Sequence, residues 1–484
     1  MFLGIDIGTS AVKALIMQPD GGIAASATCP LTVQSPHPLW SEQDPNAWTQ
    51  AVLTACEGLR QDNPDAYRTV RAIGLSGQMH GAVCLDGDRR PVRPAILWND
   101  GRSHAECALL RDRRPDIGLI AGVPPMPGFT APKLLWMARN EPDLHARIRH
   151  VILPKDYVRL FLTGTLATDM ADAAGTLWLD QEKRAWSPAL CEISETDPDW
   201  LPDCLEGTAA SGTLTGDAAS KLDLQPGLPV AAGGGDAATG AMGIGAVNDG
   251  DAFLSLGTSG QLFVSTDTYR PNPESAVHAF AHCVPDRWFQ MAAMLNGASP
   301  LDWYARLVGR PIADLLSEAA ADKNARIPLF LPYLTGERTP HNDPHIRAGF
   351  YGMDPATGQA AMTQAVLDGI AYTFCDALDA LTSAGTSIRR PAAIGGGARG
   401  DLLLQTLSDA LGLEILRYRD AETGPAYGAA RLAVLAVGAA SLDDIATAPA
   451  VDRIFEPDTS TRTYHRDRLG QFRALYKALK TISD

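Results

Sequence analysis

The feature that most constrains this chain is a short pattern that occurs twice, about half a chain apart. The apolar segment 2–7 runs into Gly8-Thr9-Ser10, and the apolar segment 252–256 runs into Gly257-Thr258-Ser259. The first copy carries a carboxylate, Asp6, that the second lacks. Each copy predicts a strand ending in a turn whose backbone N–H groups and hydroxyls can donate to phosphate oxygens. The repeat therefore predicts a duplicated domain with one donor loop from each half facing a shared cleft.

The length of the chain agrees with a duplication. A chain of 484 residues is too long for one ordinary hydrophobic core, so two large domains are expected. Glycine, proline, aspartate and serine accumulate over residues 200–252, directly before the second copy. We therefore place the boundary near residue 245, which gives an N-terminal domain of residues 1–245 and a C-terminal domain of residues 246–484.

Local periodicity predicts an α/β fold. Residues 2–8 and 11–18 predict a β-hairpin around the first Gly-Thr-Ser turn. Strands and helices are expected to alternate in the second half, which favours a mixed sheet flanked by helices. The further predicted strands are residues 72–75, 228–232, 392–394 and 414–417, and the further predicted helices are residues 46–59, 131–139, 157–162, 237–245, 401–411 and 426–437.

Composition excludes several classes of partner. The net charge of −15 argues against a nucleic-acid surface, which is usually basic. The eight cysteines form no C-x-x-C pair and are expected to be free thiols in a reducing compartment. No basic leader precedes the first strand, and the longest run of small apolar residues, 429–440, contains Arg431 and is too short to span a bilayer. We expect a cytoplasmic protein with no membrane or nucleic-acid partner.

Asp236 is the first candidate for chemistry. It follows three glycines at the end of a predicted strand and begins a predicted helix, which is where open α/β sheets place ligand groups. One interpretation is a general base that accepts a proton from a substrate hydroxyl during phosphoryl transfer. The other is a helix N-cap, a position that favours aspartate. Position alone does not separate the two, and one residue can serve as both.

Asp6 is the second candidate. It lies between Ile5 and Ile7 in an apolar strand, and its side chain points to the opposite face from both isoleucines. A carboxylate in such a strand needs a partner, which is either Mg²⁺ or nearby backbone in a turn. We favour the metal, because Thr9, Ser10 and Lys13 supply phosphate donors beside it.

A glycine-rich turn in the second half allows two nucleotide interpretations. Residues 395–400 match G-x-G-x-x-G, and Asp420 follows 20 residues after Gly400, as in a dinucleotide-binding fingerprint. Alternatively this turn and the glycine-interrupted segment 424–428 bracket an adenine and a ribose. The chain contains no G-x-x-x-x-G-K-[ST], so a P-loop is excluded.

Two polar loops carry weaker signals. The turn Ser76–Gly81 follows a predicted strand and contains His80, which either hydrogen-bonds a sugar hydroxyl or has a structural role. The charged segment Gly336–Asn342 has no apolar period, and we expect a surface loop or a hinge there.

In their order along the chain, these segments resemble the FGGY carbohydrate kinases, a branch of the actin, hexokinase and Hsp70 superfamily. The likeness covers essentially the whole chain and is greatest to the bacterial members that phosphorylate D-xylulose. It is carried by residues 4–10, 39–45, 76–81, 128–136, 153–157, 255–259 and 395–399. The last of these resembles the family's adenosine motif, which weighs against a dinucleotide-binding fold.

The resemblance implies a fold and a reaction. Each half would be a ribonuclease-H-like lobe, and a hinge would close the central cleft over both substrates. ATP with Mg²⁺ would donate its γ-phosphoryl group to the 5-hydroxyl of D-xylulose. Asp236 would act as the base at this hydroxyl, and Asp6 would hold the metal. A homodimer is also implied.

The resemblance also assigns binding residues. Met79 and His80, with Asp236, would contact the sugar. The residues expected at the nucleotide are Thr9, Ser10, Lys13, Gly257, Thr258, Gly397 and Ala398.

One departure from the family pattern keeps other substrates open. Ala237 stands where D-xylulose kinases usually have an asparagine after the catalytic aspartate. Loss of that amide makes another pentulose or a polyol, such as ribulose, arabinitol or xylitol, an alternative acceptor. A nucleotide-gated binding or sensor protein on the same fold is a second alternative, and a dehydrogenase is a third.

Overall fold

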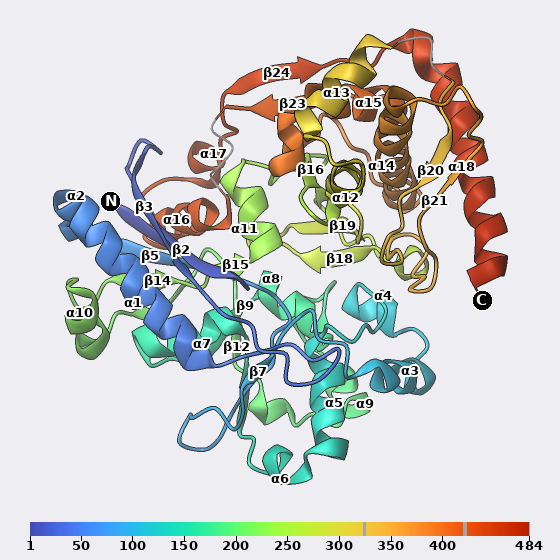
Figure 1. The fold of residues 1–484 in the computed structure, drawn as a ribbon. Helices are drawn as coiled ribbons and strands as arrows, with labels where there is room; N and C mark the ends of the chain where they lie inside the picture. The colour runs from blue at the N-terminus through green and yellow to red at the C-terminus, as the bar shows by residue number, and fades with distance from the viewer. Residues whose placement is uncertain (323–325, 420–423, 484) are drawn as a thin grey trace.

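The computed structural model describes residues 1–322, 326–419 and 424–483. Two seven-stranded mixed sheets, one from each half of the chain, form the centres of two lobes. Figure 1 shows the first half mainly in the lower part of the molecule and the second half above it. The expected α/β fold with two lobes is confirmed.

The first sheet is built around the N-terminal hairpin. Strands β1 (Phe2–Ile7), β2 (Ala11–Met17) and β3 (Ile23–Pro30) form an antiparallel meander, and β5 (Ala72–Gly77) pairs in parallel with β1. The sheet is completed by β14 (Pro229–Ala231), β13 (Ala210–Thr213) and β15 (Gly234–Gly235). Because β1 and β5 run in parallel, Asp6 and Ser76 lie side by side where both strands end.

The second sheet repeats this plan. The meander consists of β16 (Ala252–Leu256), β17 (Gly260–Thr266) and β19 (Trp288–Met294), and β22 (Ala392–Ile394) pairs in parallel with β16. Outer strands are β18 (His278–Ala281), β23 (Ile415–Tyr418) and β24 (Val451–Phe455). Strands β1 and β16 thus occupy equivalent places, as the predicted duplication requires.

One face of the first sheet is covered by a helix from its own lobe. Helix α1 (Pro45–Asp62) begins after Asp44, whose side chain accepts the N–H of Asn46. Its buried face, which includes Trp48 and Val52, packs in one cluster with Ile5 and Ile7. This packing leaves the side chain of Asp6 on the other face of the sheet.

That other face is covered by a helix from the second half of the chain. Helix α16 (Gly424–Ala436) lies against β1 and β5, next to α11 (Asp236–Gly243) (Figure 1). Gly4 and Gly74 permit the contact, because a Cβ atom would lie 1.9 Å from the Ala426 carbonyl oxygen at Gly4 and 1.7 Å from the Ala429 carbonyl oxygen at Gly74. The two halves therefore interlock.

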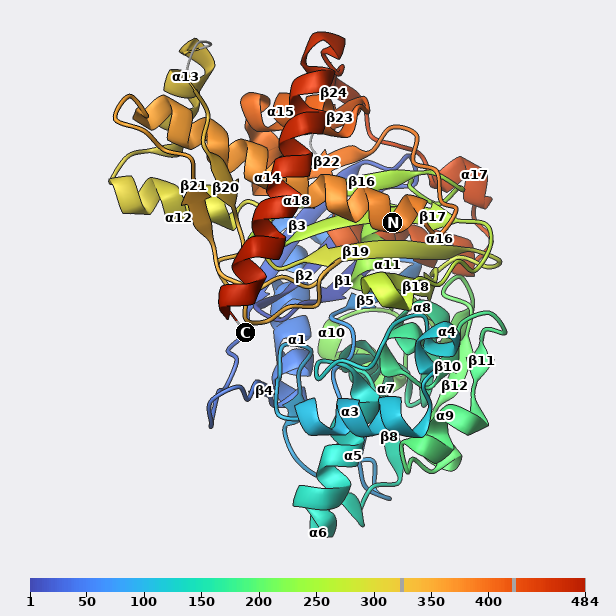
Figure 2. The same ribbon diagram turned by 90° about the vertical axis from the view of Figure 1, so that its right-hand side faces the viewer.

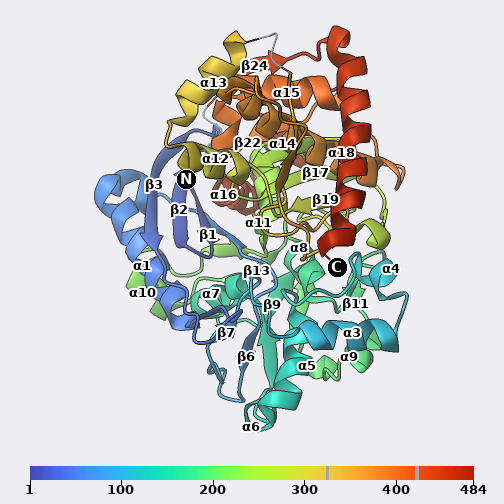
Figure 3. The ribbon, with the colours of Figure 1, turned by 45° about the vertical axis from the view of Figure 1, so that its right-hand side comes forward.

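The remaining elements surround this framework. Figures 2 and 3 show α18 running along the outside of the second lobe and α3, α5, α6 and α9 at the far end of the first. In the first half these elements are α2 (Pro64–Arg68), α3 (His104–Arg113), α4 (Ile117–Ala121), α5 (Thr130–Asn140), α6 (Pro142–His145), α7 (Pro154–Thr163), α8 (Met170–Ala173), α9 (Pro188–Ile193), α10 (Gly216–Leu222), β4 (Glu42–Gln43), β6 (Val83–Leu85), β7 (Ala95–Ile96), β8 (His150–Ile152), β9 (Ala167–Asp169), β10 (Leu179–Asp180), β11 (Ala185–Trp186) and β12 (Asp203–Leu205). In the second half they are α12 (Ser299–Val308), α13 (Ile312–Ala321), α14 (Gln359–Thr382), α15 (Asp401–Leu411), α17 (Leu442–Ile445), α18 (Arg462–Ser483), β20 (Leu329–Leu331) and β21 (Gly349–Tyr351).

The structure also bears on the expected absence of a membrane span and on Asp420. Among the described residues, none of the helices combines the length and the hydrophobicity needed to cross a membrane. Asp420, the acidic residue of the possible dinucleotide fingerprint, lies outside the described residues.

Candidate active site

A chain of hydrogen bonds connects Asp6 with the turn that carries Asp236. Asp6 lies near the end of β1, and its Oδ1 accepts a hydrogen bond from the Ser76 hydroxyl on β5 at 2.8 Å. The Ser76 oxygen lies 2.7 Å from the Thr239 hydroxyl, on the first turn of α11. Asp236 begins that helix, and its Oδ1 accepts the N–H of Ala237 at 2.8 Å. The two sequence-predicted carboxylates thus belong to one site.

Both carboxyl groups have raised pKa values. Desolvation raises the pKa of Asp6 to about 6, although the Ser76 hydrogen bond and the charge of Lys13 act in the opposite direction. Desolvation, followed by the charge of Asp6, raises the pKa of Asp236 to about 7. The Asp236 side chain is nevertheless accessible to solvent, so dense protein surrounds a carboxyl group that a ligand can still reach. Such a carboxyl group is suited to accepting and releasing a proton near neutral pH.

The first Gly-Thr-Ser turn is fixed by polar side chains. The Thr9 hydroxyl donates to Oε1 of Gln78 and accepts from Nε1 of Trp98, both at 2.9 Å, and Nε2 of Gln43 donates to the Thr9 carbonyl at 2.7 Å. Ser10 is exposed on the same turn, and Lys13 lies opposite Asp6 in the β1–β2 register. Of the predicted phosphate donors, Lys13 acts on the Asp6 carboxylate through its charge, and Thr9 and Ser10 lie on the turn that follows β1.

The second Gly-Thr-Ser turn borders a hollow in the second lobe. Gly257, Thr258 and Gly397 line this hollow, whose volume is about 630 Å³. Gly395, with φ of +86°, begins the turn after β22, and α15 follows. Ala398 is buried beneath the turn and is not among the residues that line the hollow. Three of the predicted nucleotide residues thus meet at one site.

His80 has an unusual backbone that its neighbours hold in place. Its φ is +69°, a left-handed value that is uncommon outside glycine. The His80 carbonyl accepts from Thr130 at 3.0 Å and from Lys133 Nζ at 2.9 Å. Its Nδ1 lies 2.7 Å from the Gly175 carbonyl, which makes Nδ1 the donor and leaves Nε2 as an acceptor. Burial lowers the pKa of the ring to about 3, so His80 is neutral.

Met79 lies between His80 and the turn that carries Asp236. A Cβ atom at Gly235 would lie 2.6 Å from Met79 Cγ, and one at Gly175 would lie 3.1 Å from Met79 Cε and 2.4 Å from His80 Nδ1. Met79 therefore lies against the turn that carries Asp236, and Gly175 lies against both Met79 and His80.

A buried cluster of charges lies behind this turn. The ammonium group of Lys155 contacts Asp156, lies 2.7 Å from Asp169 Oδ2 and 3.4 Å from Asp172 Oδ2, and all four side chains are buried. Desolvation, and to a lesser extent charges that include Asp236, raise the pKa of Asp172 well above its usual range. Because the ammonium group lies among the three carboxyl groups, we interpret them as an ion-pair cluster and not as a metal site.

Sequence reasoning did not identify several residues of the site. Ser76, Thr239 and Lys133 are buried and act through hydrogen bonds to the named candidates. Their only sequence signal was their position in segments already singled out, since a serine or threonine after a strand has many ordinary roles.

One expectation was wrong. Of the two expectations for the segment Gly336–Asn342, the surface loop is wrong, because Glu337 is 1% exposed and Thr339 is fully buried, and the hinge stays a prediction. The Glu337 carboxylate accepts hydrogen bonds from the backbone N–H groups of Leu295 and Arg338, and from Asn296 Nδ2 at 3.2 Å. These contacts fold the loop onto the end of β19, and local charge gave no indication of them.

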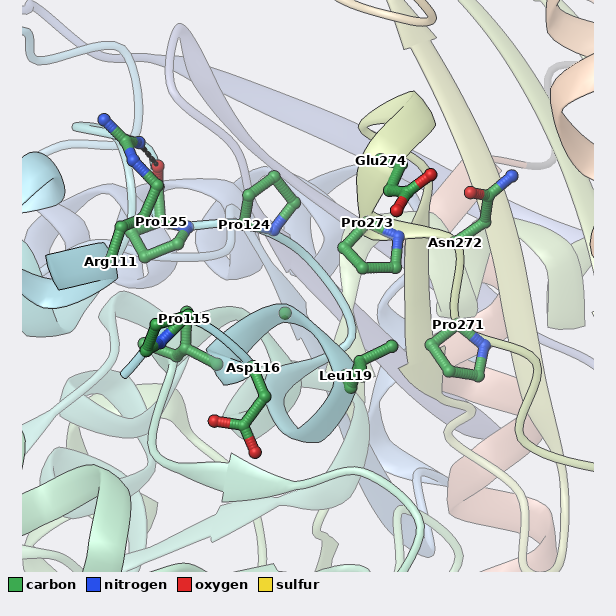
Figure 4. A pocket seen from close by; sticks show the side chains of 12 residues that line it. Arg111, Pro115, Asp116, Leu119, Pro124, Pro125, Pro271, Asn272, Pro273 and Glu274 are labelled. Carbon is green, nitrogen blue, oxygen red and sulfur yellow. Dashed lines mark hydrogen bonds between the residues drawn. The ribbon is translucent and has the colours of Figure 1, made fainter. Parts of the chain in front are cut away.

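A further hollow, of about 430 Å³, lies between residues 111–125 and residues 271–274. Figure 4 shows prolines of both segments around it, including Pro124 and Pro273. None of its lining residues is a candidate from the sequence. We therefore do not assign substrate binding to it.

Comparison with known proteins identifies the family to which this arrangement belongs. The family models "FGGY family of carbohydrate kinases, N-terminal domain" and "C-terminal domain" match residues 1–243 and 252–437. The chain is 44% identical over 482 residues to a xylulose kinase of Escherichia coli (strain K12), covering 99% of both chains. It is 46% identical over 439 residues to one of Klebsiella pneumoniae, covering 90% of both.

The solved structures agree with this result. A xyloylose kinase from Brucella ovis has a TM-score of 0.96 and 45% sequence identity, with 99% of both chains covered. The matches include both sheets and both Gly-Thr-Ser turns. The chain is a sugar kinase, and it belongs to the FGGY family of carbohydrate kinases.

Proposed function

We propose that this kinase transfers the γ-phosphoryl group of ATP to the 5-hydroxyl of D-xylulose, giving D-xylulose 5-phosphate and ADP. The observation that carries the proposal is Asp236, with its raised pKa, on a turn that lies against Met79, in a chain whose relatives at 44–46% identity are xylulose kinases. In the reaction, the bond from the sugar oxygen to the γ-phosphorus forms while the bond from that phosphorus to the β,γ-bridging oxygen breaks.

Asp236 acts as the base in this mechanism. It accepts the proton of the 5-hydroxyl as the oxygen attacks, and ADP departs with the electron pair of the broken bond. A pKa of about 7 supports this role, because the ionised form is available near neutral pH and its affinity for a proton is high. The N-cap of α11 is Gly235 and no side chain caps the helix, so the N-cap interpretation of Asp236 was wrong; Asp236 is the first residue of the helix, which fixes its position.

The carboxylates fit a divalent cation. Asp6 and Asp236 are both desolvated, and the charge of Asp6 raises the pKa of Asp236, so the site has an excess of negative charge that Mg²⁺ would offset. Asp6 would hold the ion, and the ion would neutralise charge on the transferred phosphoryl group. Ser76 orients the Asp6 carboxylate for this role through its 2.8 Å hydrogen bond.

The two turns bind opposite parts of the nucleotide. Gly257, Thr258 and Gly397, in the hollow of the second lobe, receive the nucleotide, and Ala398 supports their turn from below. The first turn contributes Thr9, Ser10 and Lys13 to the phosphates. Because the Thr9 hydroxyl is already bonded to Gln78 and Trp98, Thr9 binds through its main chain.

The proposal is tested by ADP release from purified protein with ATP and Mg²⁺. The acceptors are D-xylulose, L-xylulose, D-ribulose, L-ribulose, xylitol, arabinitol and glycerol, with a sugar-free control. A strong preference for D-xylulose is expected. Absence of ADP release with every acceptor would contradict the kinase mechanism and favour a nucleotide-gated binding protein.

A second acceptor class rests on one residue. Ala237 offers no side-chain amide next to Asp236, and its N–H is bonded to the Asp236 carboxylate. Another pentulose or a polyol is therefore the alternative acceptor. The variant Ala237→Asn, assayed with the same acceptors, should increase preference for D-xylulose if the amide sets selectivity.

Three broader expectations belong to this proposal. We place the lobe boundary near residue 245, with residues 1–245 and 246–484 as the two lobes, and the cytoplasm as the place of action. The described cysteines are all free thiols, which supports a reducing compartment. The homodimer that the family resemblance implies stays a prediction, and light scattering after gel filtration would test it.

A further inference from the structure

The loop Gly336–Asn342 brings an arginine from the second half of the chain to the proposed sugar site. Glu337 holds this loop on β19, and the Thr339 hydroxyl donates to the Ala276 carbonyl at 3.1 Å, two residues before β18. Arg338 lies between these two anchors. Its charge lowers the pKa values of both His80 and His278, although desolvation is the larger cause at each ring. The bond from Thr339 to Ala276 places Arg338, the preceding residue, close to His278, which follows Ala276 by two residues.

Within the described parts of the chain, the Arg338 guanidinium has no protein partner. Among the described residues, none accepts a hydrogen bond from its side chain, and Glu337, whose charge acts on it, is engaged by Leu295 and Asn296. Desolvation lowers the pKa of Arg338 from its usual value. Arg338 is only partly exposed, so a ligand that offers oxygen acceptors would supply hydrogen bonds that the described residues do not.

His278 is a second unpartnered group at the same place. It lies on β18 and is 3% exposed, yet within the described part of the chain neither ring nitrogen has a hydrogen-bond partner. Its pKa lies well below the usual range, mainly because of burial, so the ring is neutral with one donor and one acceptor unused. Buried polar groups in folded proteins are normally bonded, so two unused nitrogens in a binding site point to a ligand.

Aromatic rings connect these groups with His80. The ring of Phe129 lies 4.3 Å from that of His80 and 5.9 Å from that of His278, measured between centroids. His80 comes from the first half of the chain and His278 from the second. This row of rings therefore crosses between the two lobes at the end of the sugar site beyond Met79.

We propose that Arg338 and His278 bind the carbonyl end of the acceptor sugar from the second lobe. The inference rests on the proposed function, in which Asp236 serves the 5-hydroxyl. Met79 lies against the Asp236 turn, and both Met79 and His80 lie against Gly175, so a pentulose whose 5-hydroxyl is at Asp236 would extend past Met79 and direct its C1 and C2 oxygens toward His80, His278 and Arg338. Arg338 donates to these oxygens, and His278 completes the set of hydrogen bonds.

This arrangement makes the sugar a bridge between the lobes. His80 and Met79 hold it from the first lobe, and Arg338 and His278 hold it from the second. A site built to bond substrate oxygens rejects analogues that lack them, because its buried polar groups are then left unpaired. Arg338 and His278 are thus specificity-determining residues, and the chemistry of transfer stays with Asp236.

The test is a comparison of Arg338→Met, His278→Phe and the wild-type enzyme. We expect each variant to raise the KM for D-xylulose about tenfold to hundredfold, as loss of a hydrogen bond to a charged or buried group does. The KM for ATP and the sugar-independent hydrolysis of ATP should not change. Arg347→Met is the matched control, because Arg347 is exposed and donates to the carbonyls of its own loop.

A substrate analogue makes the test specific. The analogue 1-deoxy-D-xylulose lacks the C1 oxygen, so its KM with the wild type should be as high as the KM of Arg338→Met for D-xylulose. Arg338→Met should raise the KM for the analogue little further. Arg338→Lys keeps the positive charge and an N–H donor, so its KM for D-xylulose should lie between those of the wild type and Arg338→Met. Melting temperatures and sugar binding measured by calorimetry without ATP separate loss of binding from loss of folding.

The outcomes distinguish this inference from the proposed function. An unchanged KM for D-xylulose in Arg338→Met and His278→Phe, with wild-type turnover intact, overturns the inference and leaves the function standing. A raised KM for ATP with unchanged sugar binding also overturns it, because Arg338 would then serve the phosphates. Failure of the wild type to turn over D-xylulose overturns the function and the inference together.

Discussion

The hydroxyl of Ser76 donates a 2.8 Å hydrogen bond to the carboxylate of Asp6. The Ser76 oxygen also lies 2.7 Å from the Thr239 hydroxyl, which donates to the Gly235 carbonyl at 3.1 Å. Thr239 belongs to the helix that Asp236 begins. Two fully buried hydroxyls therefore set the position of one carboxylate relative to the other, although neither hydroxyl needs to touch a substrate.

The first prediction concerns this hydrogen bond. In Ser76→Ala, Asp6 loses a donor that fixes its orientation, and residues that orient metal ligands typically contribute tenfold to hundredfold to metal affinity or activity. We expect the Mg²⁺ concentration for half-maximal activity to rise by about that factor. Ser265→Ala is the control, since Ser265 makes a similar buried bond, 2.7 Å to the Ala246 carbonyl, on the second sheet. Equal Mg²⁺ dependence in Ser76→Ala and wild type would contradict the prediction.

The second prediction concerns the base. Asp236→Asn keeps the shape of the side chain but cannot accept the proton, so turnover should fall by about 10² to 10⁴-fold or more. The measurement is kcat for ADP release at saturating sugar and ATP, with circular dichroism to verify folding. Near-normal turnover in a folded variant would exclude Asp236 as the base.

The third prediction links the same carboxyl group to stability. The fold raises the Asp236 pKa from 3.8 to about 7, so the protonated form is favoured by folding. Its contribution to stability is fully present below about pH 4 and is lost as the pH rises through 7. In metal-free and nucleotide-free protein, Asp236→Asn should therefore gain melting temperature relative to wild type between pH 5 and pH 8.

A surface aspartate provides the control for that measurement. Asp217, whose side chain is 91% exposed, is replaced in Asp217→Asn. The difference in melting temperature between Asp217→Asn and wild type should stay nearly constant over the same pH range. If the difference in melting temperature between Asp236→Asn and wild type were equally constant, the pKa of the Asp236 carboxyl group would not be raised by the fold.

The fourth prediction concerns the support of His80. A methyl group at Gly175 would lie 2.4 Å from His80 Nδ1, so Gly175→Ala should displace the ring and raise the KM for the sugar while the KM for ATP stays unchanged. Gly470→Ala is the matched control, because a Cβ atom there would meet nothing within 4 Å. This substitution should only stabilise helix α18, by about 0.5–1 kcal/mol. Unchanged sugar kinetics in Gly175→Ala would show that His80 does not need this position.

The sequence was most informative where local pattern and chemistry coincide. The positions of Asp6 and Asp236 were predictable because Asp6 lies near the end of an apolar strand before a Gly-Thr-Ser turn and Asp236 follows three glycines, whereas their roles stay predictions. The two Gly-Thr-Ser turns were predictable because they recur with the same strand before them. The same logic predicted α15, which the structure places at residues Asp401–Leu411.

Other parts could not be predicted because their partners are distant in the chain. Glu337 has the local pattern of a surface loop, and its burial depends on Leu295 and Asn296, about 40 residues earlier. The sequence shows His278 only as one histidine in a strand. Its surroundings come from Phe129 and from the loop of Arg338, which are distant in the chain. The apolar period of α16 predicted a helix, but it did not indicate which sheet the helix would cover.

The interlock of α16 with the first sheet also sets an order of events during synthesis. When residues 1–245 have left the ribosome, every strand of the first sheet exists, but the helix that fits against Gly4 and Gly74 has not yet been made. At ordinary translation rates the wait is on the order of ten seconds. Throughout that time the nascent first lobe presents one uncovered face, and this is the stage at which the newborn chain is most exposed to aggregation.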